Sequence, residues 1–149
     1  MSNANPLSMY VPIKQDDATQ KLVRDVAAGF VKSVEKGLSD SNIVHYARLV
    51  LIPKPKEKED EKEKVLAILL VTVFDGPMNA YLDYFWRRAD INLAIQGVAA
   101  LAKDPPKLPF KNVDEFQNFI NSVNLSAPKD LYSAYDATVK QIKAAFPPE

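Results

Sequence analysis

The sequence predicts an α+β fold built around a small antiparallel sheet. Two long apolar runs, residues 43–52 and 65–74, are separated by a charged segment at residues 53–64, and this pattern is typical of a β-hairpin. A period-two pattern at residues 7–13 precedes them, and a helical stripe at residues 17–38 lies between. The order strand, helix, strand, strand, helix predicts a ferredoxin-like split βαβ core, in which the third strand lies antiparallel between the other two.

The first predicted strand alternates along its length, which indicates one buried face. Its apolar positions are Leu7, Met9, Val11 and Ile13. Pro12 cannot donate a hydrogen bond to a neighbouring strand, so we expect it at a strand end or at the edge of the sheet. N-cap candidates at residues 16–19 begin the following helix, and Gly37 with the polar segment 39–42 is expected to end it.

The two hairpin strands are apolar on both faces, whereas most antiparallel hairpins leave one face to water. We therefore expect cover on both sides, from helices on one face and from a second surface on the other. The loop at residues 54–64 interleaves Lys and Glu almost evenly, so it carries little net charge. We expect this loop to be solvated, mobile and dispensable.

Helices are predicted to fill the C-terminal half. Pro77 suits the first turn of a helix, and the apolar spacing loosens at residues 87–90, where we expect a break with Asp90 capping the next helix. Prolines end that helix near residues 103–106. Residues 112–115 have the spacing of a capping box.

A last helix is predicted to open at Ser126 and Pro128 and to continue toward the end of the chain. Its apolar stripe would be Leu131, Tyr135, Val139 and Ile142. We find no fourth strand, because residues 107–111 are short and contain Pro109. The first strand should therefore form an edge of the sheet.

One face of this sheet is left apolar after the helices are placed. Depending on register, it carries Val44, Val50 and Ile52, or else Ile43, Ala47 and Leu49, with partners from residues 65–73. Such a face is larger than a monomer normally exposes. The late helices could fold over it, or a twofold axis could pack two sheets together as a dimeric α+β barrel, and we favour this homodimer.

Composition describes an ordinary globular protein and bounds its partners. The 149 residues fit one α+β domain over positions 1–149, and 19 basic residues balance 19 acidic ones, so no global field favours nucleic acid or an anionic membrane. No cysteine is present, which excludes disulfides and thiolate metal sites. The first ten residues lack a secretory pattern, and the apolar runs are too short to span a bilayer, so we expect a soluble cytoplasmic protein.

Two segments resemble a known sequence pattern. NIVHYARLVLIP and LLVTVFDGPMNAYLDYF are similar to an HFAR, NFDG and YLDDF pattern in uncharacterised proteins of the dimeric α+β barrel superfamily. The matching positions are His45, Ala47, Arg48, Phe74, Asp75, Gly76, Tyr81, Leu82, Asp83 and Phe85. The resemblance implies the fold and a dimer. It implies no particular activity, because that superfamily includes monooxygenases, haem peroxidases and chlorite dismutase-like enzymes.

Three residues are candidates for ligand binding: His45, Arg48 and Asp75. His45 is the one histidine and lies within a strand, where it is either a hydrogen-bonded structural residue or, less readily, an axial haem ligand. Arg48 is a charge within an apolar strand and should meet a carboxylate or an anionic ligand. Asp75 reads as a turn and cap residue or as a general base.

The function itself stays open at this stage. The leading hypothesis is a homodimeric ferredoxin-like protein with a small-ligand pocket between sheet and helices, near the three candidate residues. The alternative is a small-molecule oxidoreductase, either monooxygenase-like or haem-binding. No metal site and no resident cofactor is predicted, with haem kept only for the alternative. Phosphate-binding loops and known catalytic motifs are absent from the sequence.

Overall fold

The computed structural model describes residues 4–147 and has an α+β architecture within them. The strands are β1 (Ala4–Pro12), β2 (Val44–Pro53) and β3 (Val65–Asp75). The helices are α1 (Asp17–Ser41), α2 (Met78–Arg87), α3 (Ala89–Ala100), α4 (Val113–Val123) and α5 (Val139–Ala145), with a 3-10 turn, η1, at Pro128–Asp130. No helix in the described range is both long and apolar enough to cross a bilayer.

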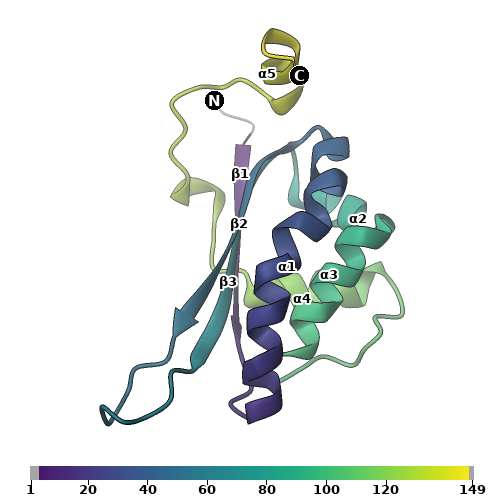
Figure 1. Cartoon of the computed structure of the whole chain (residues 1–149). Helices are drawn as coiled ribbons and strands as arrows, with labels where there is room; N and C mark the ends of the chain where they lie inside the picture. The colour runs from purple at the N-terminus through teal and green to yellow at the C-terminus, as the bar shows by residue number, and fades with distance from the viewer. Residues whose placement is uncertain (1–3, 148–149) are drawn as a thin grey trace.

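The three strands form one sheet in the order β1-β3-β2. Both outer strands run antiparallel to β3, so β1 and β2 are parallel to one another, as predicted from the order of elements. Figure 1 shows α1, α2 and α3 on one side of this sheet, while the segment after α4 passes along the other side of β1 to α5. The main hydrophobic core lies between the sheet and these helices.

β1 supplies its alternating side chains to the core, which confirms the predicted buried face. Leu7, Met9 and Val11 are all less than 2 % exposed. β1 forms an edge of the sheet, and Pro12 is its last residue. In place of a fourth strand, the described chain contributes single bridges, one of them between Met9 and Asn124, because the segment after α4 crosses this edge only briefly.

α1 is longer than predicted because Gly37 does not end it. Asp16 caps the helix by accepting a hydrogen bond from the Thr19 backbone N–H at 2.9 Å. The helix ends at Ser41, within the polar segment 39–42 predicted to end it, and its C-cap Asn42 adopts the left-handed conformation with φ 55°. A Cβ at Gly37 would stand 2.8 Å from the Asp90 carboxylate, so this glycine allows close approach of α3 instead.

The break between α2 and α3 is confirmed at Arg88, which has extended backbone. Asp90 is not the cap that the sequence suggested, because Arg88 occupies that position and Asp90 lies in the first turn of α3. The Arg88 side chain contacts Asp90 at 3.0 Å and Asp40 at 2.8 Å, and so ties α1 to the helix break. These two hydrogen bonds, led by that to Asp40, raise the pKa of Arg88.

The predicted helix after Ser126 is wrong. Beyond η1, residues 131–138 are irregular, and α5 begins only at Val139. Of the predicted stripe only Val139 is buried, whereas Tyr135 is 82 % exposed, so the segment before Val139 has little surface to pack against. Because a short helix without tertiary packing is marginal in water, the spacing alone does not suffice to form one.

Candidate functional site

His45 and Asp75 are brought together at the end of the sheet. A β-bulge places His45 between the pairs Val44–Phe74 and Tyr46–Val73, and its Nε2–H donates to the Asp75 Oδ1 at 2.7 Å. The other carboxylate oxygen accepts a hydrogen bond from the Val139 backbone N–H, also at 2.7 Å. Asp75 therefore joins β2 to the first residue of α5. Both of its oxygens are occupied by structural partners.

Arg48 does not join this pair. It pairs across the sheet with Val71 and lies exposed on the face opposite the helices. Among residues 4–147, the structure records no hydrogen bond or ion pair for Arg48. Arg48 is therefore exposed in the single chain and forms no ion pair with a carboxylate of the described residues, and binding of an anionic ligand stays a prediction. Strand alternation turns this side chain to solvent, where a guanidinium needs no protein partner.

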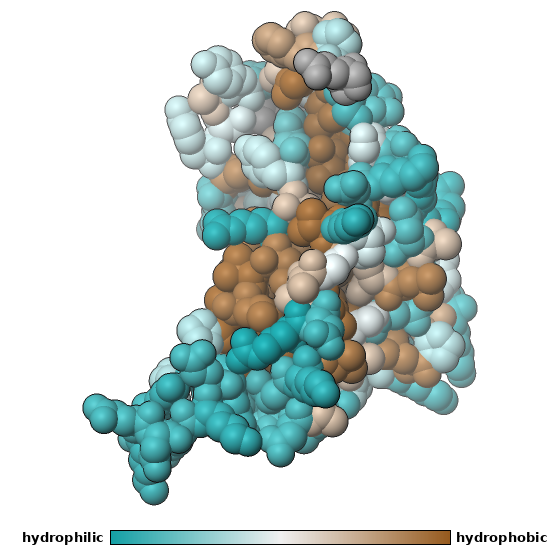
Figure 2. Space-filling model, viewed as in Figure 1, coloured by the Kyte–Doolittle hydropathy of each residue, from teal (hydrophilic) through white to brown (hydrophobic). Residues whose placement is uncertain are grey.

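The open face of the sheet, meaning the face of β2 and β3 opposite the helices, is largely apolar. The register places on it Tyr46, Arg48, Val50, Ile52, Ala67, Leu69, Val71 and Val73. This agrees with the first of the two registers considered above, except that Val44 packs against the core. Figure 2 shows the corresponding hydrophobic patch, bordered by hydrophilic side chains.

The C-terminal segment covers only the β1 side of that face. The Ser126 hydroxyl contacts the Ser8 hydroxyl, and the Leu125 N–H donates to the Ser8 carbonyl at 2.9 Å. Pro6 is buried beneath this crossing. α5 lies at the end of the sheet, where the Lys143 Nζ donates to the Ser39 carbonyl at 2.7 Å. On the β2 and β3 portion of the face, Ala67 and Val73 are buried, whereas Tyr46 and Arg48 are exposed. Val50, Ile52, Leu69 and Val71 are half-buried.

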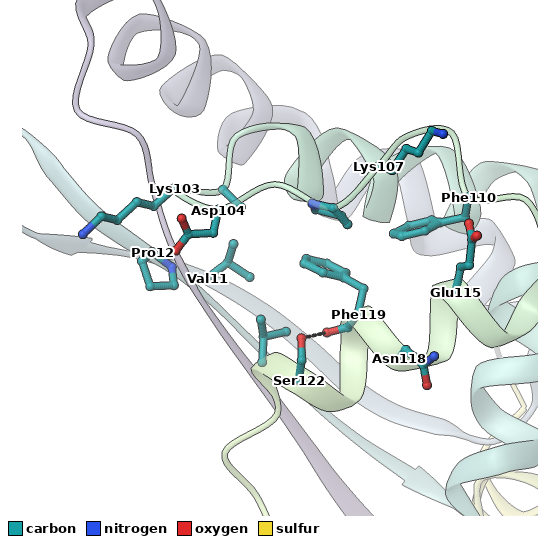
Figure 3. Close-up of a pocket in the computed structure, with 13 residues that line it drawn as sticks. Val11, Pro12, Lys103, Asp104, Lys107, Phe110, Glu115, Asn118, Phe119 and Ser122 are labelled. Atoms are coloured by element: carbon teal, nitrogen blue, oxygen red, sulfur yellow. Dashed lines mark hydrogen bonds between the residues drawn. The ribbon is translucent and has the colours of Figure 1, made fainter.

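A separate cleft of about 710 Å³ lies beside α4 (Figure 3). We call it the α4 cleft; it is walled by β1, by the connection between α3 and α4, and by α4 itself. Its apolar lining is Val11, Pro12, Ala102, Pro106, Phe110, Phe119 and Val123. Its polar lining is Lys103, Asp104, Lys107, Glu115, Asn118 and Ser122.

None of the three residues predicted from sequence lines the α4 cleft. The connection at residues 101–112 was interpreted only as a helix end followed by irregular chain. Three prolines followed by Phe110 are the sequence feature that could have marked this connection as a cleft wall. Prolines keep this connection out of regular helix, and it packs against α4 through Phe110, whose ring lies 5.8 Å from that of Phe116 and 5.9 Å from that of Phe119.

The interior between sheet and helices offers little space. A cavity lined by Phe30, Ala47 and Phe85, among others, has a volume of about 10 Å³, at the lower limit for holding one water molecule. A depression of about 280 Å³ adjoins Asp75, but it lies at the surface among Gly76, Thr138 and Lys140. The volume suited to a small molecule therefore lies in the α4 cleft and not beside His45.

The residues with perturbed pKa values lie outside the α4 cleft, and Tyr81 and Asp40 are examples. Burial raises the pKa of Tyr81, whose hydroxyl donates to the Thr72 hydroxyl at 2.7 Å. The Lys36 ammonium and the Arg88 guanidinium lower the pKa of Asp40. In the described chain, no group of three or more His, Cys, Asp and Glu side chains is placed to hold a metal ion.

Comparisons with known proteins return no match. No protein-family model, no curated protein and no solved structure is similar to this chain. Function is therefore inferred from the chemistry of the open face and of the α4 cleft.

Proposed function

We propose that this protein binds a small, mainly apolar molecule in the α4 cleft. The observation that carries the proposal is the cleft itself, with a volume of about 710 Å³ and a lining that combines apolar and polar side chains. Ligand pockets in proteins span roughly 300–1,000 Å³ and combine apolar walls with a few polar groups that orient the ligand. Phe110 and Phe119 are 6 % and 8 % exposed and form part of the wall.

A fluorescent apolar dye tests this proposal. N-phenyl-1-naphthylamine is uncharged and brightens when it leaves water. We expect saturable binding at one site per chain, and a loss of at least roughly tenfold in affinity when Ser122→Trp fills the cleft. Asn121→Trp is the matched control, because Asn121 is exposed on the same helix and does not line the cleft. Equal binding by the wild type and both variants would refute the site.

A second proposal concerns assembly: the protein forms a homodimer through the open face of β2 and β3. The apolar strip that carries Val50, Leu69 and Val71 favours it, since a twofold axis would bury the same strip on both copies. An isologous interface of roughly 1,200–2,000 Å² in total would be ordinary. This arrangement would be a dimeric α+β barrel built from ferredoxin-like protomers.

Sedimentation equilibrium tests the assembly. We expect a dimer at micromolar concentration for the wild type and a monomer for Val71→Lys, because a lysine would be buried opposite its own copy. Leu93→Lys is the control, since Leu93 is an apolar residue 69 % exposed on α3, away from the open face. A wild-type monomer throughout the micromolar range would rule the homodimer out.

Two further predictions concern the location of the protein and an alternative chemistry. A cytoplasmic location stays a prediction, supported by the absence of cysteine in the sequence. The alternative of a haem-binding or monooxygenase-like oxidoreductase has one inexpensive test, the visible spectrum of the purified protein. A Soret band would favour this alternative over simple ligand binding.

A further inference from the structure

The two edges of the sheet differ in how well they are covered. Other segments cover the outer edge of β1: the Ser8 N–H donates to the Asn124 Oδ1 at 3.1 Å, and the Lys103 N–H donates to the Pro12 carbonyl at 2.7 Å. Across residues 4–147, the backbone of β2 is hydrogen-bonded to β3 alone. A long edge strand with unpaired backbone groups is a template for a further strand.

The side chains of β2 are also incompletely covered. No residue of β2 is buried, whereas β1 and β3 each supply several buried side chains. Even Ala47, Leu49 and Leu51, which face the helices, are only half-buried. A partner placed beside β2 would therefore cover apolar side chains as well as pair the backbone.

α1 lies where a second copy of the helix could pack against it. Phe30 and Val34 line the same small cavity as Ala47 of β2 and Leu70 of β3, so α1 runs above the line between these two strands. Neighbouring strands lie about 4.8 Å apart. If a second β2 paired with the first across a twofold axis, the two α1 helices would therefore lie roughly 10 Å apart, within the range of packed helices.

The flank of α1 on this side carries a self-complementary stripe. Arg24, Ala28, Val31 and Glu35 follow one another at spacings of four, three and four residues, so they share one side of the helix. All four are exposed, and Arg24 lines a surface depression together with Leu51 of β2. In an antiparallel pair of α1 helices, the axis that opposes Ala28 to Val31 also opposes Arg24 to Glu35.

The same axis suits the strand. Arg24 lies at the level of Leu51, and Val34 lies at the level of Ala47. The midpoint of the stripe therefore falls close to Leu49, which is near the middle of β2. One twofold axis beside Leu49 thus pairs two β2 strands antiparallel and two α1 helices antiparallel at once.

The charges at the ends of the stripe are available to a partner. In the part of the chain that the structure describes, no ion pair is recorded for Arg24 or Glu35. The Arg24 guanidinium donates to the Glu63 backbone carbonyl at 3.3 Å, which leaves its charge uncompensated. A twofold axis would form the pair of Arg24 with Glu35 twice.

We propose that a second copy of this chain docks on the edge of β2, so that two sheets join into one and the α1 helices pack side by side. This surface is separate from the open face, so both can be occupied together, and the inference goes beyond the proposed function. Exposed ion pairs and small side chains contribute little. We therefore expect the weaker of the two contacts here, with a dissociation constant on the order of 100 μM.

Charge exchange in the Val71→Lys background, which blocks the open face, tests the edge. We expect sedimentation equilibrium at low salt to show a monomer at micromolar concentration and mainly a dimer at roughly 0.5 mM. Arg24→Glu or Glu35→Arg alone opposes like charges and should weaken this association roughly tenfold, and the two together should restore it. Restoration also shows that the single variants are folded.

Asp25→Lys is the matched control, because Asp25 is exposed beside Arg24 but points about 100° away around the helix. It should leave the association unchanged. Amide exchange across Val44–Pro53 should slow at the higher concentration, because the outer backbone groups of β2 become paired.

A monomer at 0.5 mM, association that neither single reversal weakens, or unchanged exchange in β2 would overturn the edge contact. Weakening by Asp25→Lys equal to that by Arg24→Glu would overturn it as well, because the effect would then not depend on the stripe. If Val71→Lys stayed dimeric at micromolar concentration, the open-face dimer would be wrong, and loss of that dimer on single reversal with its return on double exchange would support the edge.

Discussion

Asp75 provides the sharpest test of how the C-terminal helix is held. We predict that Asp75→Ala lowers the free energy of unfolding by about 3 kcal/mol. The carboxylate accepts two hydrogen bonds of 2.7 Å, from His45 and from Val139, and bonds to a charged acceptor contribute roughly 1.5–3 kcal/mol each. The side chains of His45 and Asp75 are 14 % and 10 % exposed, so water can partly replace the lost partner, and the lower end of that range applies.

The loss should also be local. α5 is held by the bond from Val139 to Asp75, by the bonds of Lys143 to Ser39 and Asn42, and by the burial of Val139. Removing the carboxylate should therefore raise hydrogen exchange across Val139–Ala145 far more than in β3. Urea denaturation followed by the fluorescence of Trp86, with amide exchange read by mass spectrometry, measures both effects.

Asp83→Ala is the control for charge removal. Asp83 pairs with Arg87 at 2.7 Å, but both side chains are largely exposed, so its loss should change stability by less than about 0.5 kcal/mol. If Asp75→Ala left both stability and exchange of α5 at wild-type values, the structural role would be wrong. A residue kept for catalysis commonly costs stability, so an increase in stability would instead revive the general-base reading.

Three further changes have defined outcomes. Tyr81→Phe should cost about 1–2 kcal/mol at neutral pH, because the buried Thr72 hydroxyl loses its donor. Burial raises the pKa of Tyr81 above its ordinary value of 10.0, so the wild type should lose stability as pH rises beyond that value. Denaturation measured at several pH values should show a smaller loss for Tyr81→Phe, which has no hydroxyl to ionise. Arg48→Met should leave the unfolding free energy of the isolated chain within about 0.5 kcal/mol, and a loss of several kcal/mol would restore the buried ion pair. Replacing residues 55–62 with a short turn should keep the melting temperature within a few degrees, because the Lys54 N–H still donates to the Lys64 carbonyl. If the variant failed to fold, the loop would be required for the structure.

The sequence by itself determined the order and direction of the strands and the position of the hairpin. Residues 43–52 and 65–74 agree closely with β2 and β3, because a continuous run of β-branched and aliphatic residues leaves few other structures open. Pro12 at the edge and the break near Arg88 were also predictable. Each follows from a local property of the backbone, the missing proline donor in one case and a loss of apolar spacing in the other.

Only the tertiary structure decided which side chains share a site. A bulge at His45 sets the register, and the register turns Arg48 to the open face while it brings His45 to Asp75. Periodicity reports that a residue has a buried face, but it does not report which distant segment supplies the cover. The α4 cleft likewise depends on how the connection after α3 packs against α4. Such packing is set by long-range contacts between segments, which local sequence patterns do not encode.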